Sequence, residues 1–180
     1  MGLFDRRRLD RPSETVHDAR SPVVGRPQPS RRIVQGRPGA SGRHGRDQDD
    51  PWTRAQSLDG RISSELTPTE RQLVGFAELR NEVNNGGFNQ FFFNSGGDWA
   101  LDALSAAEAV NLDVLAGLLR RALAVLGEPY PVDRLRRQDV LLKLDGEREG
   151  LLQVLDGDYY QLEVDLDLDA AMQRLAEACQ

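Results

Sequence analysis

Apolar side chains recur at helical spacing from residue 67 onward. After the sequence TPTE at 67–70, one helix face stays apolar through Leu73, Phe76, Ala77 and Val83. TPTE is a capping box with proline at the first helical position, which is typical of a helix start. The pattern predicts a helix from Thr67 to about Asn84. It should end at the glycines 86–87, because glycine accepts the left-handed backbone that follows a last turn.

The rest of the chain continues in this pattern. A short aromatic turn at 88–93 comes next, and Asp98 is expected to cap the helix after it. VDLDLD at 164–169 is the one stretch with strand-like alternation, and it is too short to form a sheet by itself. The sequence predicts an all-α fold, with further helices at 99–110, from 111 or 112 to 126, at 132–144, at 147–155 and at 169–178.

Four phenylalanines lie within six positions, and paired glycines flank them at 86–87 and 96–97. In one interpretation the glycines let the chain turn twice, and Phe88, Phe91 and Phe92 pack inward to anchor a helix crossing. The neighbouring asparagines would then serve turns and caps. In the other interpretation the same segment is a corner that binds a ligand.

The two parts of the chain differ in charge. Residues 1–50 carry 11 basic and seven acidic residues, a net charge of +4, whereas residues 51–180 carry 12 basic and 22 acidic residues, a net charge of −10. The first part is rich in Arg, Gly, Pro and Ser and lacks the apolar surface that would offset the entropy of ordering it. We predict a disordered basic arm over residues 1–62 and a compact helical domain over residues 63–180. The arm is either a binding segment for nucleic acid, anionic lipid or an acidic protein, or a solubilising leader.

The folded part offers little for catalysis or metal binding. Both histidines, His17 and His44, lie in the arm, and Cys179 is the single cysteine, which excludes multi-cysteine zinc patterns and most catalytic triads. DLDLD at 165–169 resembles the start of an EF-hand loop, but alanine occupies the positions that require Gly and Glu. We predict no metal, no cofactor and no enzymatic activity. The chain also lacks a signal-peptide pattern and an apolar run near the roughly 20 residues of a membrane span, so we expect a cytoplasmic protein without membrane contact.

The strongest surface candidate is the stretch DGDYYQLEVDLDLD at 156–169, which contains no basic residue. If its last six residues are extended, alternate carboxylates lie roughly 6 to 7 Å apart on one side. Such a row would imitate phosphates and attract a basic partner. The alternative is a solvated acidic run that favours the start of the terminal helix. The candidate partner-binding residues are Asp156, Asp158, Glu163, Asp165, Asp167 and Asp169.

The segment ELRNEVNNGGFNQFFFNSGGDWALDAL at 78–104 resembles the signature of the bacterial DNA-mimic protein family, a group otherwise labelled as a domain of unknown function. The resemblance continues more weakly over about residues 67–180. It implies an all-helical fold. In the founding example it implies a dimer whose acidic surface imitates the phosphates of duplex DNA and occupies a transcription factor. The matching residues are mostly uncharged, so we assign them to the scaffold: Glu82, Val83, Asn85, Gly86, Gly87, Phe88, Gln90, Phe91, Phe92, Asn94, Ser95, Gly97 and Asp98.

Two functional hypotheses follow. In the first, the protein is a non-enzymatic interaction protein whose acidic face binds a basic protein, such as a transcription factor or another DNA-binding regulator, with a homodimer as its assembly. Direct nucleic-acid binding would then be confined to the arm. In the second, the corner between Glu82 and Asp98 binds a small molecule or peptide, or acts as a weak hydrolase.

Overall fold

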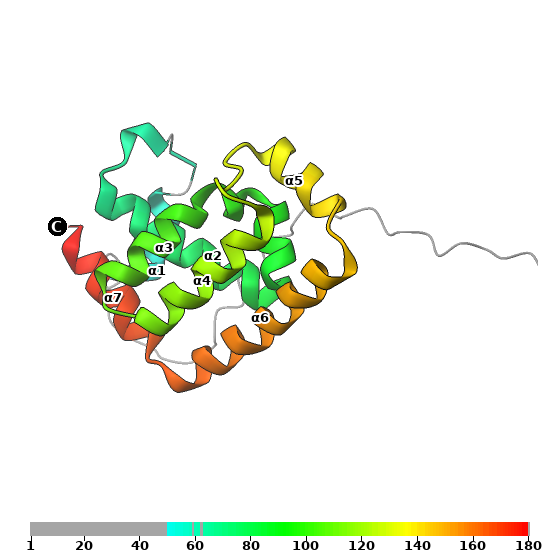
Figure 1. The fold of residues 1–180 in the computed structure, drawn as a ribbon. Coiled ribbons are helices and arrows are strands. Elements are labelled where there is room, and N and C mark those ends of the chain that lie inside the picture. The colour runs from blue at the N-terminus through cyan, green and yellow to red at the C-terminus, as the bar shows by residue number, and fades with distance from the viewer. Residues whose placement is uncertain (1–49, 59, 62, 180) are drawn as a thin grey trace, which may run out of the picture. The chain divides into compact units, whose positions relative to one another are not determined.

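The computed structural model describes residues 50–58, 60–61 and 63–179, and this part of the chain is helical (Figure 1). It contains no strand, which confirms the predicted all-α class. The elements are α1 (Pro51–Leu58), the 3₁₀ helix η1 (Ser63–Glu65), α2 (Pro68–Phe93), the 3₁₀ helix η2 (Ser95–Trp99), α3 (Ala100–Ala109), α4 (Asp113–Leu126), α5 (Arg134–Leu142), α6 (Gly146–Asp165) and α7 (Leu168–Ala178).

Most of the predicted arm, residues 1–49, lies outside the described residues. Its final part contains α1, where Ala55 and Leu58 are buried and Trp52 packs against the core. The guanidinium of Arg80 lies over the Trp52 ring, 5.0 Å from its centroid. The structured part therefore begins before the boundary that we placed at residue 63.

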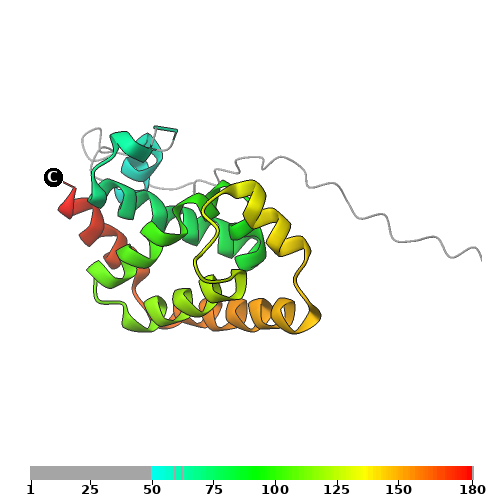
Figure 2. The same ribbon diagram turned by 45° about the horizontal axis from the view of Figure 1, so that its top comes forward.

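Helix α2 is the central element, since α1, α3, α5, α6 and α7 all pack against it. Its start follows the predicted capping box, in which the Thr67 hydroxyl accepts a hydrogen bond from the backbone N–H of Glu70 and the Glu70 carboxylate accepts one from that of Thr67. Helix α4 packs against α3 and α6. Both ribbon views place α5 and α6 at outer edges of the domain (Figures 1 and 2).

Helix α2 bends at the predicted glycines. Gly86 and Gly87 leave the helical conformation, and Gly87 has a φ of 74°, which favours glycine. The chain then resumes its helix through Phe93. We refer to residues 86–94 as the aromatic bend.

The second glycine pair, at 96–97, is needed for close packing. Gly97 has no positive φ, but a Cβ at this position would come 2.6 Å from Nε of Arg137 and 2.9 Å from the Phe92 carbonyl oxygen. Glycine is required here because a side chain and a backbone approach it closely. The chain does turn back here, since α3 packs against α2, but it is this close contact and not a positive φ that requires glycine.

Three aromatic rings fill the interior of the bend. Phe88, Phe91 and Phe92 are each 0% exposed. The Phe91 and Phe92 ring centroids are 5.3 Å apart, and Tyr159 of α6 meets the Phe88 ring edge to face at 5.9 Å. The core interpretation of these residues is confirmed.

Two predicted boundaries were wrong. Asp98 does not cap α3, because Trp99 takes that position without a side-chain hydrogen bond, and Asp98 lies in η2. The helix predicted at 147–155 runs on to Asp165. Gly157 weakens a helix interior by about 1 kcal/mol, but buried Leu155 and Tyr159 on either side of it hold the helix against the core.

Candidate partner-binding surface

The acidic run at 156–169 is helical over most of its length. Asp156 to Asp165 lie on α6, and Asp169 lies in the first turn of α7. Only Leu166 and Asp167 separate the two helices. The expected extended row of alternate carboxylates is therefore wrong, and the side chains instead point in several directions around two helices.

Asp156 faces the interior of the domain. Its Oδ1 accepts a hydrogen bond from the backbone N–H of Phe88 at 2.7 Å, just beyond the bend, where helical N–H groups lack partners. Burial raises the pKa of Asp156, and the Phe88 N–H only partly offsets this. This carboxylate serves the bend and is not part of an outward surface.

Glu163 also points inward, toward α2. It accepts hydrogen bonds from Nε and Nη2 of Arg80 at 3.1 and 3.0 Å, from the Tyr159 hydroxyl at 2.7 Å and from the Asn84 amide at 3.0 Å. Burial alone would raise the pKa of Glu163, but the hydrogen bonds from Arg80 and Tyr159 outweigh it and lower the pKa. Arg80 therefore holds Glu163 as a carboxylate within the packed domain.

The other four predicted carboxylates are exposed: Asp158, Asp165, Asp167 and Asp169. Asp158 lies 3.4 Å from Arg121 of α4, and Asp169 pairs with Arg80 at 2.8 Å while its side chain remains 78% exposed. Asp167 caps α7 by accepting from the Ala170 N–H at 2.8 Å. Pairs this exposed are weak, so these carboxylates stay available to a partner.

Sequence reasoning missed Glu147, which is also exposed on α6. It precedes Asp158 by 11 residues and Asp165 by 18, and both intervals return a helix to nearly the same face. At 1.5 Å per residue the three carboxylates span about 27 Å along α6. The spacing was visible in the sequence but was hidden by the prediction that the helix stopped at residue 155. We call the exposed set the acidic strip: Glu147, Asp158, Asp165, Asp167 and Asp169.

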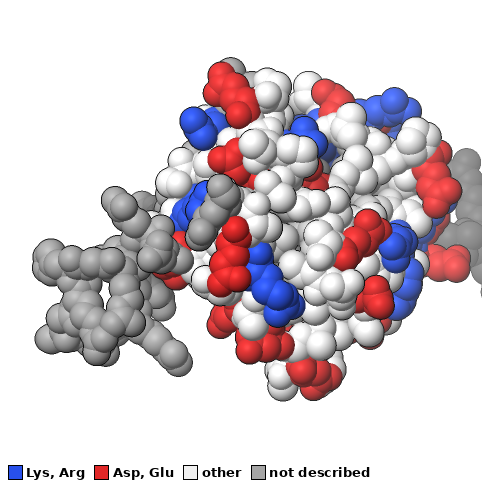
Figure 3. All heavy atoms as spheres, turned by 90° about the vertical axis from the view of Figure 1, so that its left-hand side faces the viewer, with Lys and Arg blue, Asp and Glu red and all other residues white. Residues whose placement is uncertain are grey.

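The acidic strip is not part of a uniformly acidic surface. On the face seen in Figure 3, which is the left-hand side of Figure 1, acidic and basic side chains are interspersed among uncharged ones. Arg121 beside Asp158 and Arg80 beside Asp169 contribute to this mixture at the strip itself.

The motif residues outside the phenylalanines build the bend. Oε2 of buried Glu82 accepts hydrogen bonds from the side-chain amides of Gln90 and Asn94 at 2.8 and 3.0 Å, which ties the two halves of α2 together. Asn85 and Ser95 are exposed at either end of the aromatic segment. These hydrogen bonds of Glu82, Gln90 and Asn94 support the assignment of the motif to the scaffold.

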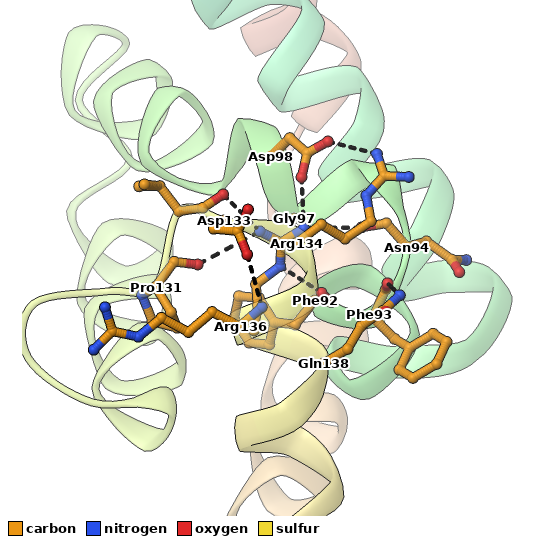
Figure 4. A network of polar contacts seen from close by, with 12 residues as sticks. Phe92, Phe93, Asn94, Gly97, Asp98, Pro131, Asp133, Arg134, Arg136 and Gln138 are labelled. Carbon is orange, nitrogen blue, oxygen red and sulfur yellow. Dashed lines mark hydrogen bonds and ion pairs between the residues drawn. The ribbon is translucent and has the colours of Figure 1, made fainter.

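Asp98 belongs to a second network, centred on Arg137 of α5. Fully buried Arg137 donates to the Phe92 carbonyl at 2.6 Å, to the Asn94 carbonyl at 3.2 Å and to Asp98 at 2.6 Å, and Arg134 pairs with the other Asp98 oxygen at 2.5 Å (Figure 4). Burial raises the pKa of Asp98, but the two arginines outweigh it and lower the pKa. Glu82 and Asp98 are each held in place, which leaves the hypothetical ligand-binding or hydrolytic corner without a free acid and base.

Residues 64–179 match the family model described as DMP19-like protein. The chain belongs to this family. The match covers α2 to α7 and thus contains both the aromatic bend and the acidic strip, whereas α1 precedes it. It confirms the resemblance to DNA-mimic proteins that the motif at 78–104 indicated. Neither a curated protein nor a solved structure matches the chain.

Two further findings concern the described part of this DMP19-like chain. No group of three or more His, Cys, Asp or Glu side chains in it is placed to hold a metal ion. None of its helices combines the length and the apolar character needed to cross a membrane.

Proposed function

We propose that this DMP19-like protein is a non-enzymatic interaction protein that binds a basic, DNA-binding protein through its acidic strip. The observation that carries the proposal is the placement of α6, an outer helix with Glu147, Asp158 and Asp165 on one exposed face and with Asp167 and Asp169 at its end. The net charge of −10 over residues 51–180 supports it, because such a field attracts a basic protein and repels nucleic acid.

The spacing of the strip limits what is imitated. Duplex DNA carries one negative charge per about 1.7 Å of its axis, whereas α6 presents three carboxylates over about 27 Å. The strip therefore replaces a few phosphates and not a continuous backbone. We infer that it speeds the encounter with the partner more than it adds to the final affinity.

The remaining parts of the proposal rest on the same reasoning. We infer that the protein acts in the cytoplasm, where a DNA-binding regulator would meet it, and that it assembles as the homodimer that the family resemblance implies. A non-enzymatic role is supported by the location of His17 and His44 outside residues 50–180 and by the engaged state of Glu82 and Asp98.

Affinity purification from the native cell, with the full chain as bait, tests the proposal. The recovered basic protein is bound to fluorescent duplex DNA and titrated with the wild-type protein and with the double variant Asp158→Lys and Asp165→Lys. We expect the wild type to displace the DNA and the variant to associate about tenfold more slowly at low salt.

The matched control is Glu65→Lys with Glu128→Lys, which makes the same change in net charge at two exposed carboxylates outside the strip. If both double variants slow association equally, only net charge matters and the strip is not the binding surface. If neither variant changes displacement, the carboxylates have no role in binding.

A further inference from the structure

Helix α6 turns an uncharged row of residues away from the core. Leu152, Leu155 and Tyr159 form its buried face. On the opposite side, five residues follow one another at alternating intervals of four and three, which keeps them on one face of a helix. Paired helices contact each other through rows with these intervals. We call this set the outer row: Gly150, Val154, Gly157, Gln161 and Val164.

The outer row has no covering residue in the described part of the chain. Val154 is 57% exposed and Val164 is 79% exposed. Both ribbon views place α6 at an outer edge of the domain (Figures 1 and 2). A single exposed valine needs no explanation, but here two lie on one helix face together with two glycines. This face is therefore available for contact with another helix.

The two glycines of the row have no cause within the domain. Glycine in a helix interior is destabilising relative to alanine. An added Cβ would collide with neighbouring atoms at Gly87 and Gly97, but it would meet no atom within 4 Å at Gly150 or Gly157. No neighbouring helix thus requires glycine at these two positions. Small residues on one helix leave room for large side chains on a facing helix.

The charge around the outer row indicates what covers it. Residues 145–169 contain nine acidic residues and one basic residue, Arg148, and seven of these acids are exposed. Arg121 of α4 lies 3.4 Å from Asp158, and when it is counted with Arg148, exposed acids still outnumber exposed bases by seven to two. Asp158 and Asp165 directly follow row residues and so occupy a flanking position at which paired helices form ion pairs. This charge favours a basic helix.

A second copy of this chain fits the row poorly. In an antiparallel pair of α6 helices, Asp158 and Asp165 would face the flanking carboxylates of the other copy. In a parallel pair, Glu147, which lies three residues before Gly150 and continues the row, would face its own counterpart. Like charges in such positions disfavour a complex.

We propose that a basic amphipathic helix of the partner protein lies along α6. Its large apolar side chains would cover Gly150 and Gly157, and its lysines or arginines would pair with Asp158 and Asp165. The inference rests on the proposed function, because it assigns a structural element and an apolar contact to the partner of the acidic strip. The strip would select the charge of the partner, and the outer row would select its apolar spacing and add affinity.

The test uses the full chain and two synthetic lysine-rich peptides of about five helical turns with the same composition. In the patterned peptide, leucines recur at alternating intervals of four and three residues. In the scrambled peptide, the same leucines are distributed around the helix. Fluorescence anisotropy measures binding. We expect the patterned peptide to bind about tenfold or more tightly than the scrambled peptide, because only its leucines meet the outer row together.

The double variant Gly150→Gln with Gly157→Gln fills the row with larger side chains. Glutamine favours a helix more than glycine does, and the added Cβ atoms meet no atom of the domain. The variant should therefore melt at or above the wild-type temperature while it binds the patterned peptide about tenfold or more weakly. If the glycines served the fold instead, the melting temperature would fall.

The double variant Val154→Ser with Val164→Ser removes the exposed apolar side chains of the row. It should weaken the patterned peptide about tenfold and leave the scrambled peptide nearly unchanged. The matched control is Val132→Ser with Leu135→Ser, which removes two exposed apolar side chains at the start of α5. The control should bind both peptides as the wild type does.

The possible failures are distinguishable. Equal binding of the two peptides would overturn the inference and leave the proposed function intact, because the strip would then attract basic chains of any spacing. Binding of neither peptide would contradict both. Unchanged binding of the patterned peptide to the glutamine variant would also overturn the inference. So would a concentration-dependent dimer, in analytical ultracentrifugation, that the variant Val154→Ser with Val164→Ser abolishes, because a second copy would then cover the row.

Discussion

The aromatic bend lies on α2, and most of the acidic strip lies on α6, which packs against α2. The bend buries its aromatic side chains, whereas the strip exposes its carboxylates. Phe88, Phe91 and Phe92 are 0% exposed, whereas Asp169 is 78% exposed. Between them, Asp156 and Glu163 are acidic residues that serve the packed bend. The comparison shows that a negative charge does not by itself place a residue on the partner-binding surface. Two of the six carboxylates in the acidic run, those of Asp156 and Glu163, stabilise the fold instead.

The largest effect is expected from the bend. Phe91→Ala should lower the free energy of unfolding by about 3 to 5 kcal/mol, because it opens a cavity among fully buried rings. Thermal and urea denaturation measure it. Phe93→Ala, at a partly buried ring, should cost clearly less. If the Phe91→Ala protein melts like the wild type but loses partner binding, the aromatic bend would be a binding site and not a core element.

Arg137→Met should lower the free energy of unfolding by a similar amount, about 3 to 5 kcal/mol. The substitution leaves the Asp98 carboxylate and the Phe92 and Asn94 carbonyls without the donor that Arg137 provides. The matched change Arg134→Met removes an arginine from the same carboxylate, but its side chain is 45% exposed, so the loss should stay below about 1 kcal/mol. Equal losses for the two variants would show that burial of Arg137 does not matter. Urea denaturation distinguishes these outcomes.

Gly87→Ala should lower the free energy of unfolding by at least about 1 to 3 kcal/mol, because φ is 74° and ψ is −177° at this position, a region that essentially only glycine adopts. The added methyl group would also collide with the Asp156 carboxylate. Gly117→Ala in α4 is the control, since no atom lies within 4 Å of the added Cβ and the backbone is helical, so it should stabilise the domain by about 0.5 to 1 kcal/mol. Thermal denaturation in which both variants change stability in the same direction would contradict the positive φ at Gly87.

Acidic pH should weaken the hydrogen bonds that Arg80 of α2 donates to Glu163 of α6. The pKa of Glu163 is lowered in the folded state, so its contribution is present above the pKa of the unfolded chain, near 4.5, and is lost as the pH falls through the folded pKa. Asp156 changes stability in the opposite direction as the pH falls, because its pKa is raised in the folded state and its protonation therefore favours folding. Glu163→Gln should therefore be less stable at pH 7 and should lose less stability than the wild type as the pH falls below about 4.5. Urea denaturation across this range checks both expectations.

The smallest effect is expected in the acidic strip. Asp158→Asn with Asp165→Asn should change the free energy of unfolding by no more than about 0.5 kcal/mol, because both side chains are exposed. Differential scanning calorimetry measures this change. A loss of 2 kcal/mol or more would mean that the strip is part of the scaffold, as Asp156 and Glu163 are.

The sequence predicted those features that depend on local chemistry. Apolar spacing, the capping box at Thr67 and the glycines before Phe88 each act within a few residues, and the structure has all three. It did not predict the extension of α6, because Gly157 marks a helix end locally and only long-range packing of Tyr159 against Phe88 overrides it. The inward turn of Glu163 depends on Arg80, 83 residues away, and the burial of Arg137 depends on the end of α2. Such pairings have no periodic signature in a single sequence.

The contact between α1 and the end of α7 has a practical consequence for the connectivity of the chain. Arg54 donates to the Cys179 carbonyl at 2.6 Å, so the first and last helices of the described part lie side by side. Ends this close permit a circular permutation. A short glycine linker could join residue 179 to residue 50, and a new opening could be cut at Glu128 and Pro129, which are exposed in the connection between α4 and α5. In such a protein the acidic strip would keep its supporting helices, while residues 1–49 would be absent, so the proposed role of the strip could be measured on a chain without the basic arm.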